Sequence, residues 1–235
     1  CIRDRFRNED SGETHGLTRV RQFTISEGHL IVRPDQMVKE FKDCIALAQY
    51  CLQVLGVEED VTYHLSKWDP TNKEKYIGEP EVWEETEGHI RQMLEELNIP
   101  FTEDVGEAAF YGPKLDVNVK PAIGNEYTLS TCQLDFCLPA KFNLSYIDSD
   151  GTKKTPVVLH RAILGSLDRF MAYILEETKG NLPLWLAPVQ AKILPVKNED
   201  EELNAYSHDL YKYLDDNGCL LYTSPSPRDR TRYRM

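Results

Sequence analysis

The sequence predicts an α+β fold in which a mainly antiparallel sheet is flanked by helices. Three observations support this prediction. Residues 2–33 have the pattern of a β-hairpin, residues 108–160 contain a run of short strands, and amphipathic helical patterns lie before and after that run. Beyond Pro183 the pattern changes to one strand and one helix, which indicates that a second domain begins there.

The first half of the chain is expected to hold the hairpin, two helices and a further strand. The hairpin loop, DSGETHG, has the composition of a turn. Asp35 is placed to cap a helix that stops at Gly56. The alternating segment at residues 61–68 predicts a strand, and an acidic helix over residues 79–98 ends before Pro100. The first helix is expected to bury Met37, Phe41, Cys44, Ala48 and Cys51. The acidic helix is expected to bury Val82, Ile90, Met93, Leu94 and Leu97.

The second half is expected to begin with strands over residues 108–119 and 126–138, the latter as a central strand. Residues 142–160 predict a hairpin that turns between Asp148 and Gly151. An amphipathic helix is expected over residues 160–178, with Ile163, Leu167, Phe170 and Ile174 on one side. A strand over residues 189–196 and a helix over residues 201–216 complete the pattern.

Composition narrows the class of protein. No segment approaches the roughly 18 continuous apolar residues of a membrane span. The six cysteines form no CxxC pair, which indicates reduced thiols in the cytoplasm. The net charge of −12 argues against a surface covered with phosphate-binding residues. Basic residues are nevertheless concentrated in the first segment, where the alternatives are a solvated basic face and an anion site; they are Arg3, Arg5, Arg7, Arg19, Arg21 and Arg33.

The last stretch, CLLYTSPSPRDRTRYRM, differs in composition from everything before it. It is rich in Ser, Pro and Arg and lacks helical or strand periodicity, which is also typical of a basic disordered tail that binds RNA. Residues 219–229 can, however, be back-translated to a DNA sequence that resembles a sequencing adapter. We therefore expect residues 219–235 to be adapter read-through rather than native sequence.

The first hairpin carries the residues of a nucleotide site. An Arg-x-Glu pair, Arg7 and Glu9, is followed by a loop and then by Arg19 and Phe23. Arginines at two positions along a hairpin can bind successive phosphates of a polyphosphate, and the aromatic ring can stack on a base. These residues resemble motif 2 of the class II aminoacyl-tRNA synthetases, while GSLDR, with Arg169, resembles motif 3. The resemblance is to the threonyl-tRNA synthetases in particular and extends to about residue 218.

This resemblance implies roles for the matching residues. Arg7 would bind the α-phosphate and the amino-acid carboxylate, and Glu9 would accept a hydrogen bond from the adenine amino group. Phe23 and Arg169 would enclose the adenine ring, whereas Arg19 would hold the outer phosphates together with Mg²⁺. Catalysis would then rest on positioning and electrostatics, without an evident general base.

The same resemblance implies a zinc site. His29 ends the second strand of motif 2 and His160 opens HRAILGS, although a lone histidine is more often a satisfied polar residue than a ligand. In the family, the matching histidines and one cysteine hold Zn²⁺, which binds the amino and hydroxyl groups of threonine. The family's cysteine is expected upstream, since Cys1 is too close to Arg7. We therefore expect the zinc site to be incomplete.

Four further residues are expected to bind the amino acid by resemblance. Tyr111, Lys114 and Gln133 lie in the family signatures GEAAFYGPK and TCQLDF, with ordinary strand packing as the alternative. Glu27 stands where an aspartate is common, facing the amino group of the substrate. Asp168 stands where a glutamate is usual.

The predicted function is that of a threonine–tRNA ligase. It would form threonyl-adenylate from threonine and ATP and transfer the threonyl group to tRNA(Thr), as a cytoplasmic homodimer without membrane contact. The expected domains are a partial catalytic domain at residues 1–186 and the start of an anticodon-binding domain at residues 187–218. We expect this fragment alone to be inactive. The alternatives are another class II synthetase, such as the prolyl enzyme, and a non-catalytic synthetase-like protein that binds tRNA.

Overall fold

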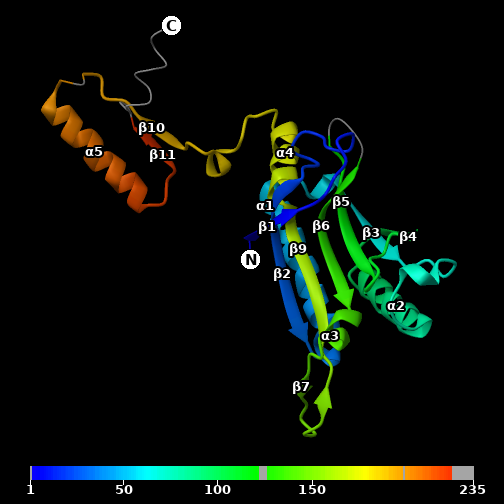
Figure 1. Ribbon diagram of the computed structural model, residues 1–235. Helices are drawn as coiled ribbons and strands as arrows, with labels where there is room; N and C mark the ends of the chain where they lie inside the picture. Colours follow the sequence, from blue (N-terminus) through cyan, green and yellow to red (C-terminus); the bar gives the residue numbers. More distant parts are fainter. Residues whose placement is uncertain (1, 122–125, 198, 224–235) are drawn as a thin grey trace. The chain divides into compact units, whose positions relative to one another are not determined.

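The computed structural model describes residues 2–121, 126–197 and 199–223, and it divides into two compact units, Cys1–Glu177 and Thr178–Met235. The first unit contains a seven-stranded sheet with strand order β1-β2-β9-β6-β5-β3-β4 (Figure 1). All neighbouring strands are antiparallel except β3 and β4. The predicted α+β class is therefore confirmed. The strands are β1 (Ile2–Phe6), β2 (Gln22–Val32), β3 (Val61–Lys67), β4 (Phe101–Val105), β5 (Lys114–Val119), β6 (Tyr127–Asp135) and β9 (Val157–Ser166).

One face of this sheet packs against two helices, α1 (Met37–Leu55) and α2 (Pro80–Glu96). Fully buried Phe41 and Ile90 of these helices join Leu65, Leu134 and Leu159 of the strands in a single core cluster. Successive side chains of a strand point to opposite faces. The residues adjacent to these core positions, including those predicted to form the site, therefore point to the other face of the sheet.

Helix α1 follows the prediction at its end but not at its start. Gly56 terminates it in the left-handed region, with a φ of 71°. Asp35 does not cap it, and that prediction is wrong. Asp35 lies in a short 3₁₀ helix, Pro34–Gln36, where its carboxylate accepts two hydrogen bonds from Arg33. The expected buried face is confirmed except at Cys51, which is half-buried; its buried members are Met37, Phe41, Cys44 and Ala48.

Helix α2 buries three of the five predicted residues, Ile90, Met93 and Leu94. Val82 and Leu97 were expected in the core, but both are exposed. Trp83 is buried instead and packs against Trp68 and Tyr76, with ring centroids 6.1 and 5.2 Å away. The segment between β3 and α2 thus covers a side of the helix that periodicity alone assigned to solvent.

The helix predicted over residues 160–178 is wrong in its first half. Strand β9 continues to Ser166, and the helix α4 spans only Leu167–Glu177. Residues 160–166 have an apolar pattern that suits a helix, but they pair with β2 on one side and partly with β6 on the other. Pairing on both sides satisfies the backbone in extended form and overrides the local pattern.

The remaining elements of the first unit are short. The predicted strand at 108–119 begins only at Lys114, and β4, directly after Pro100, was not predicted. The predicted hairpin around Asp148 is present as a separate two-stranded sheet, which Figure 1 shows extending past the end of the main sheet near α3. These elements are α3 (Cys137–Lys141), β7 (Tyr146–Ile147), β8 (Lys153–Lys154) and the 3₁₀ helices Glu58–Asp60 and Lys73–Lys75.

The second unit contains the predicted strand and helix, β10 (Ala191–Ile193) and α5 (Glu201–Asp216), after a 3₁₀ helix, Leu184–Leu186. Strand β11 (Leu221–Thr223) pairs in parallel with β10, so the start of the predicted adapter tail is extended. The rest of that tail, residues 224–235, lies outside the described residues. Among the described residues, no helix is both long and apolar enough to cross a membrane.

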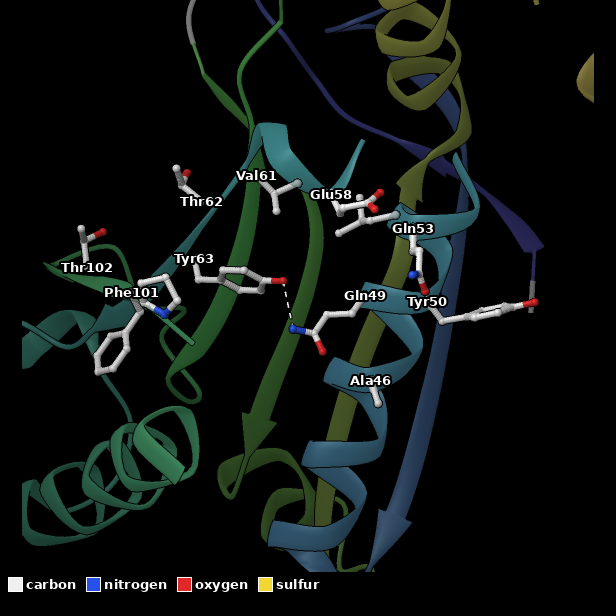
Figure 2. A pocket seen from close by; sticks show the side chains of 12 residues that line it. Ala46, Gln49, Tyr50, Gln53, Glu58, Val61, Thr62, Tyr63, Phe101 and Thr102 are labelled. Atoms are coloured by element: carbon white, nitrogen blue, oxygen red, sulfur yellow. Dashed lines mark hydrogen bonds between the residues drawn. The ribbon is translucent and has the colours of Figure 1, made fainter. Parts of the chain in front are cut away.

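The helical face of the sheet carries a groove of about 750 Å³ between α1 and strands β3 and β4. Figure 2 shows Gln49 of α1 reaching across it, where its side-chain nitrogen donates to the Tyr63 hydroxyl at 3.4 Å. Tyr63 packs against the main core, so the groove lies on the face opposite to the predicted site residues.

We predict that Gly165→Ala destabilises the first unit by roughly 2–4 kcal/mol, because it combines backbone strain with a steric clash. Gly165 has a φ of +58°, and a Cβ atom there would lie 2.1 Å from the carbonyl oxygen of Leu129. The control is Gly88→Ala in α2, where a Cβ meets nothing within 4 Å. Urea denaturation of both variants should show a loss only in the first, and equal midpoints would contradict the assignment.

Candidate functional site

Register across the sheet brings four of the predicted residues into one row. His29 of β2 is paired with His160 of β9, His160 with Gln133 of β6, and Gln133 with Lys114 of β5. Residues in register on adjacent strands lie on the same face about 5 Å apart. The two histidines, the amide and the ammonium group therefore form a continuous polar row on the face away from α1 and α2.

A cavity of about 310 Å³ adjoins one end of this row. Its walls hold the cationic residues Arg7, Arg19, Lys114 and Arg169 together with two carboxylates, and Phe23 is its aromatic residue. Such a concentration of guanidinium and ammonium groups around an aromatic ring suits a nucleoside phosphate.

Two arginines of this cavity are held in place. Arg169 donates from Nε to the carbonyl oxygen of Thr18 and from Nη1 to that of Thr128, both at 3.0 Å. Its guanidinium lies 5.6 Å from the centroid of the Tyr127 ring, and burial raises the pKa of Tyr127 to about 12. Arg7 lies 5.4 Å from the centroid of the Phe23 ring. Burial lowers the pKa of Arg169, which shows that its charge is partly removed from water.

Glu9 and Arg19 are bound to each other. Nε and Nη2 of Arg19 donate to the same Glu9 carboxylate oxygen at 3.1 and 2.9 Å, and Nη2 also donates to Glu13 at 2.9 Å. The hydrogen bonds from Arg19 lower the pKa of Glu9 below its ordinary value. Arg21 donates to the backbone carbonyl of Glu9, which fixes the segment after β1 that carries this carboxylate.

A second cavity, of about 320 Å³, lies next to the first and shares Arg7, Phe23 and Gln133 with it. Its remaining polar walls include Glu27, Tyr111 and His160. The Tyr111 hydroxyl donates to Oε1 of Gln133 at 2.6 Å. The two cavities together contain all the predicted site residues except His29, which lies beside His160 and lines neither.

Glu27, His29 and His160 can converge on one metal ion. One donor atom from each lies within 4.8 Å of the others, and the two imidazole rings are 4.6 Å apart between centroids. Nε2 of His160 donates to Oδ2 of Asp135 at 2.8 Å, which leaves the other ring nitrogen available. Burial and the neighbouring His160 lower the pKa of His29, so the neutral form that binds metals is favoured.

Sequence reasoning missed three charged residues that support the site. Arg5 pairs with Glu27, Asp135 binds His160, and Asp116 binds Lys114. Asp116 and Asp135 each follow a predicted site residue at a distance of two positions in a strand. That spacing, which places both side chains on one face, was the signal that could have identified them. His64 is partly buried and lies between the carboxylates of Asp104 and Glu126.

The chain is similar to known proteins along most of its length. Residues 2–178 match the family model described as tRNA synthetase class II core domain (G, H, P, S and T). A threonine–tRNA ligase of Clostridium perfringens is 51% identical over 194 residues, and one of Clostridium botulinum is 48% identical over 216. These matches cover 83% and 92% of this chain but only 30% and 33% of the relatives' length.

A solved structure described as the RNA binding domain of threonyl-tRNA synthetase from Cryptosporidium parvum has the same fold. Its TM-score is 0.81 at 34% sequence identity, and the match covers 95% of this chain and 54% of that one. The predicted resemblance to threonyl-tRNA synthetases is therefore confirmed.

We predict that Arg19→Met raises the pKa of Glu9 toward its ordinary value of 4.5. Because folding lowers this pKa, the pair stabilises the folded chain at pH above 4.5, and this contribution is lost as pH falls through the lowered pKa. The measurement is a carboxyl ¹³C NMR titration of Glu9. Arg21→Met is the matched control, since Arg21 binds only the backbone of Glu9; an equal change in both variants would contradict the prediction.

Proposed function

Because this chain belongs to the class II tRNA synthetase core family, we propose that the protein of which it forms part is a threonine–tRNA ligase. It activates threonine with ATP to give threonyl-adenylate and pyrophosphate, and then transfers the threonyl group to tRNA(Thr). The chain spans about 30% of the length of the relatives that it matches, so the activity belongs to the longer protein.

The observation that carries this proposal is the adjacency of the two cavities. One offers an aromatic ring and cations for a nucleotide, and the other offers a carboxylate, an imidazole and an amide for a small polar molecule. Arg7 lies in the wall that they share. A guanidinium at this junction suits a reaction in which an amino-acid carboxylate attacks the α-phosphate, because it offsets the repulsion between the two anions.

The proposed nucleotide contacts follow from the first cavity. Phe23 and Arg169 enclose the adenine ring, and Glu9 accepts a hydrogen bond from its amino group. Arg19 binds the outer phosphates with Mg²⁺. In this structure Arg19 pairs with Glu9 and Glu13, so binding of the nucleotide exchanges these carboxylates for phosphate oxygens and frees Glu9. Arg19 can make this exchange because its side chain is substantially exposed, whereas Glu9 is buried and takes the adenine amino group as its new partner.

The proposed amino-acid contacts follow from the second cavity, where Glu27 faces the amino group and Tyr111 and Gln133 complete the walls. Lys114 lies beside Gln133 in the wall of the first cavity. His29 and His160 hold Zn²⁺, and the donor set fits that ion because imidazole nitrogens are common zinc ligands. Bound zinc supplies a Lewis acid for the amino and hydroxyl groups of threonine, which isosteric valine cannot satisfy. The family's cysteine ligand matches no residue here, and Glu27 is the third donor within reach.

The proposal extends to the rest of the longer protein. We place it in the cytoplasm as a homodimer, in keeping with the family and with the unpaired state of the cysteines in the described part of the chain. We also propose that residues 187–218 begin an anticodon-binding domain. Its first strand and helix would correspond to β10 and α5.

We predict that the full-length gene product catalyses ATP–pyrophosphate exchange with threonine alone among the twenty amino acids. Arg7→Met should lower kcat about 10²–10³-fold, as expected when a donor to a developing negative charge is lost. Arg33→Met is the control, since Arg33 pairs with Asp35 outside both cavities. Exchange with another amino acid would support a class II synthetase but reject the specificity for threonine. No exchange, from a protein that still bound tRNA, would favour a non-catalytic paralogue.

We further predict that His160→Ala and His29→Ala each weaken zinc binding by this 235-residue chain by more than about 100-fold. Residues that merely orient a ligand already change metal affinity about 10–100-fold. Competition with a chromogenic chelator measures the affinity. His89→Ala in α2 is the control, and equal affinity in all three variants would reject the metal site.

A further inference from the structure

We propose that Asp116 is a positioning residue, which fixes the Lys114 ammonium group against the anions that react in the first cavity. This inference rests on the proposed function, in which Lys114 contacts the substrate. Asp116 lies on β5, two positions after Lys114, and both side chains line the cavity of about 310 Å³.

The Asp116 carboxylate is buried and fully engaged. It is 5% exposed, and it accepts hydrogen bonds from three neighbouring side chains. Oδ2 accepts from the Lys114 ammonium at 2.5 Å and from the Ser66 hydroxyl at 2.8 Å, while Oδ1 accepts from the Thr131 hydroxyl at 2.8 Å. The donors come from strands β3, β5 and β6. A buried charge is retained at small cost only when it is paired and hydrogen-bonded in this way.

The orientation of the Lys114 side chain depends on its hydrogen bond to Asp116. A lysine side chain has four rotatable bonds and loses much conformational entropy when it is fixed in one rotamer. Arg7 and Arg169 line the same cavity, so like charges repel the ammonium group from the space it shares with them. Asp116 is the carboxylate within hydrogen-bond distance that offsets this repulsion. An ammonium group has two further protons, which can contact an anionic oxygen in the cavity.

Asp116 also binds a residue that lies in the wall between the two cavities. Thr131, which donates to Oδ1, lines both of them, next to Gln133 in the polar row. One carboxylate therefore orients a cation in the nucleotide cavity and a hydroxyl at the boundary with the amino-acid cavity. An amide at this position has one acceptor oxygen instead of two, and its NH₂ group would face a donor.

The test is a double-mutant cycle in ATP–pyrophosphate exchange by the full-length protein, using Asp116→Asn, Lys114→Met and the pair. If Asp116 acts through Lys114, each single variant should lower kcat by about 100-fold, as a misplaced catalytic contact does. The double variant should then be no slower than Lys114→Met alone. The KM for ATP should change much less than kcat. Ser66→Ala, which removes a neutral hydrogen bond from the same carboxylate, should cost less than about fivefold.

One further variant and one chemical readout separate the possible failures. Asp116→Glu retains the buried charge in case Asp116→Asn does not fold, and it should also lower kcat because the longer side chain displaces Lys114. The acylation rate of the Lys114 amine, followed by mass spectrometry, should change in both Asp116 variants. Independent, multiplicative losses in the double variant, or an unchanged acylation rate, would overturn the inference. No exchange by the wild-type protein would reject the proposed function itself.

Discussion

The register between β2, β9, β6 and β5 is the constraint on which the candidate site depends. Side chains alternate along each strand, so a shift of one residue in any pairing would turn that strand's polar residues into the core. The apolar residues that alternate with these polar residues, such as Leu134 and Leu159, are fully buried under α1 and α2. Packing on the helical face therefore fixes the register, and the register in turn aligns His29, His160 and Gln133 on the other face.

The site is also constrained by its balance of charge. The whole chain carries a net charge of −12, yet cations gather in one cavity, and three of them are held by specific acceptors. Arg19 has the carboxylates of Glu9 and Glu13, and Lys114 has that of Asp116. Arg169 donates to two backbone carbonyl oxygens. Neutral acceptors fix its direction without neutralising its charge, whereas the charge of Arg19 is offset by two carboxylates.

The sequence was sufficient for elements and residues with a strong local signal. Helix α5 has the predicted bounds, α1 ends at Gly56, and the two histidines predicted from the family resemblance are neighbours in the sheet. It was insufficient where pairing partners decide the structure. Residues 160–166 have a helical pattern but are strand, because β2 and β6 supply hydrogen bonds that no local pattern contains. Asp116 and Asp135 were overlooked for the same reason, since their partners come from other strands or from two positions away.

Asp135 serves two structures at once, and this determines which tautomer of His160 is present. Its Oδ1 accepts from the backbone nitrogens of Cys137 and Leu138 at the start of α3, which orients the carboxylate. Its Oδ2 can then only accept from Nε2 of His160, so the proton stays on Nε2 and the lone pair on Nδ1. The first turn of α3 thus determines which nitrogen of the His160 imidazole, in a neighbouring strand, carries the lone pair. A change in that short helix would therefore change which ring nitrogen can bind a ligand.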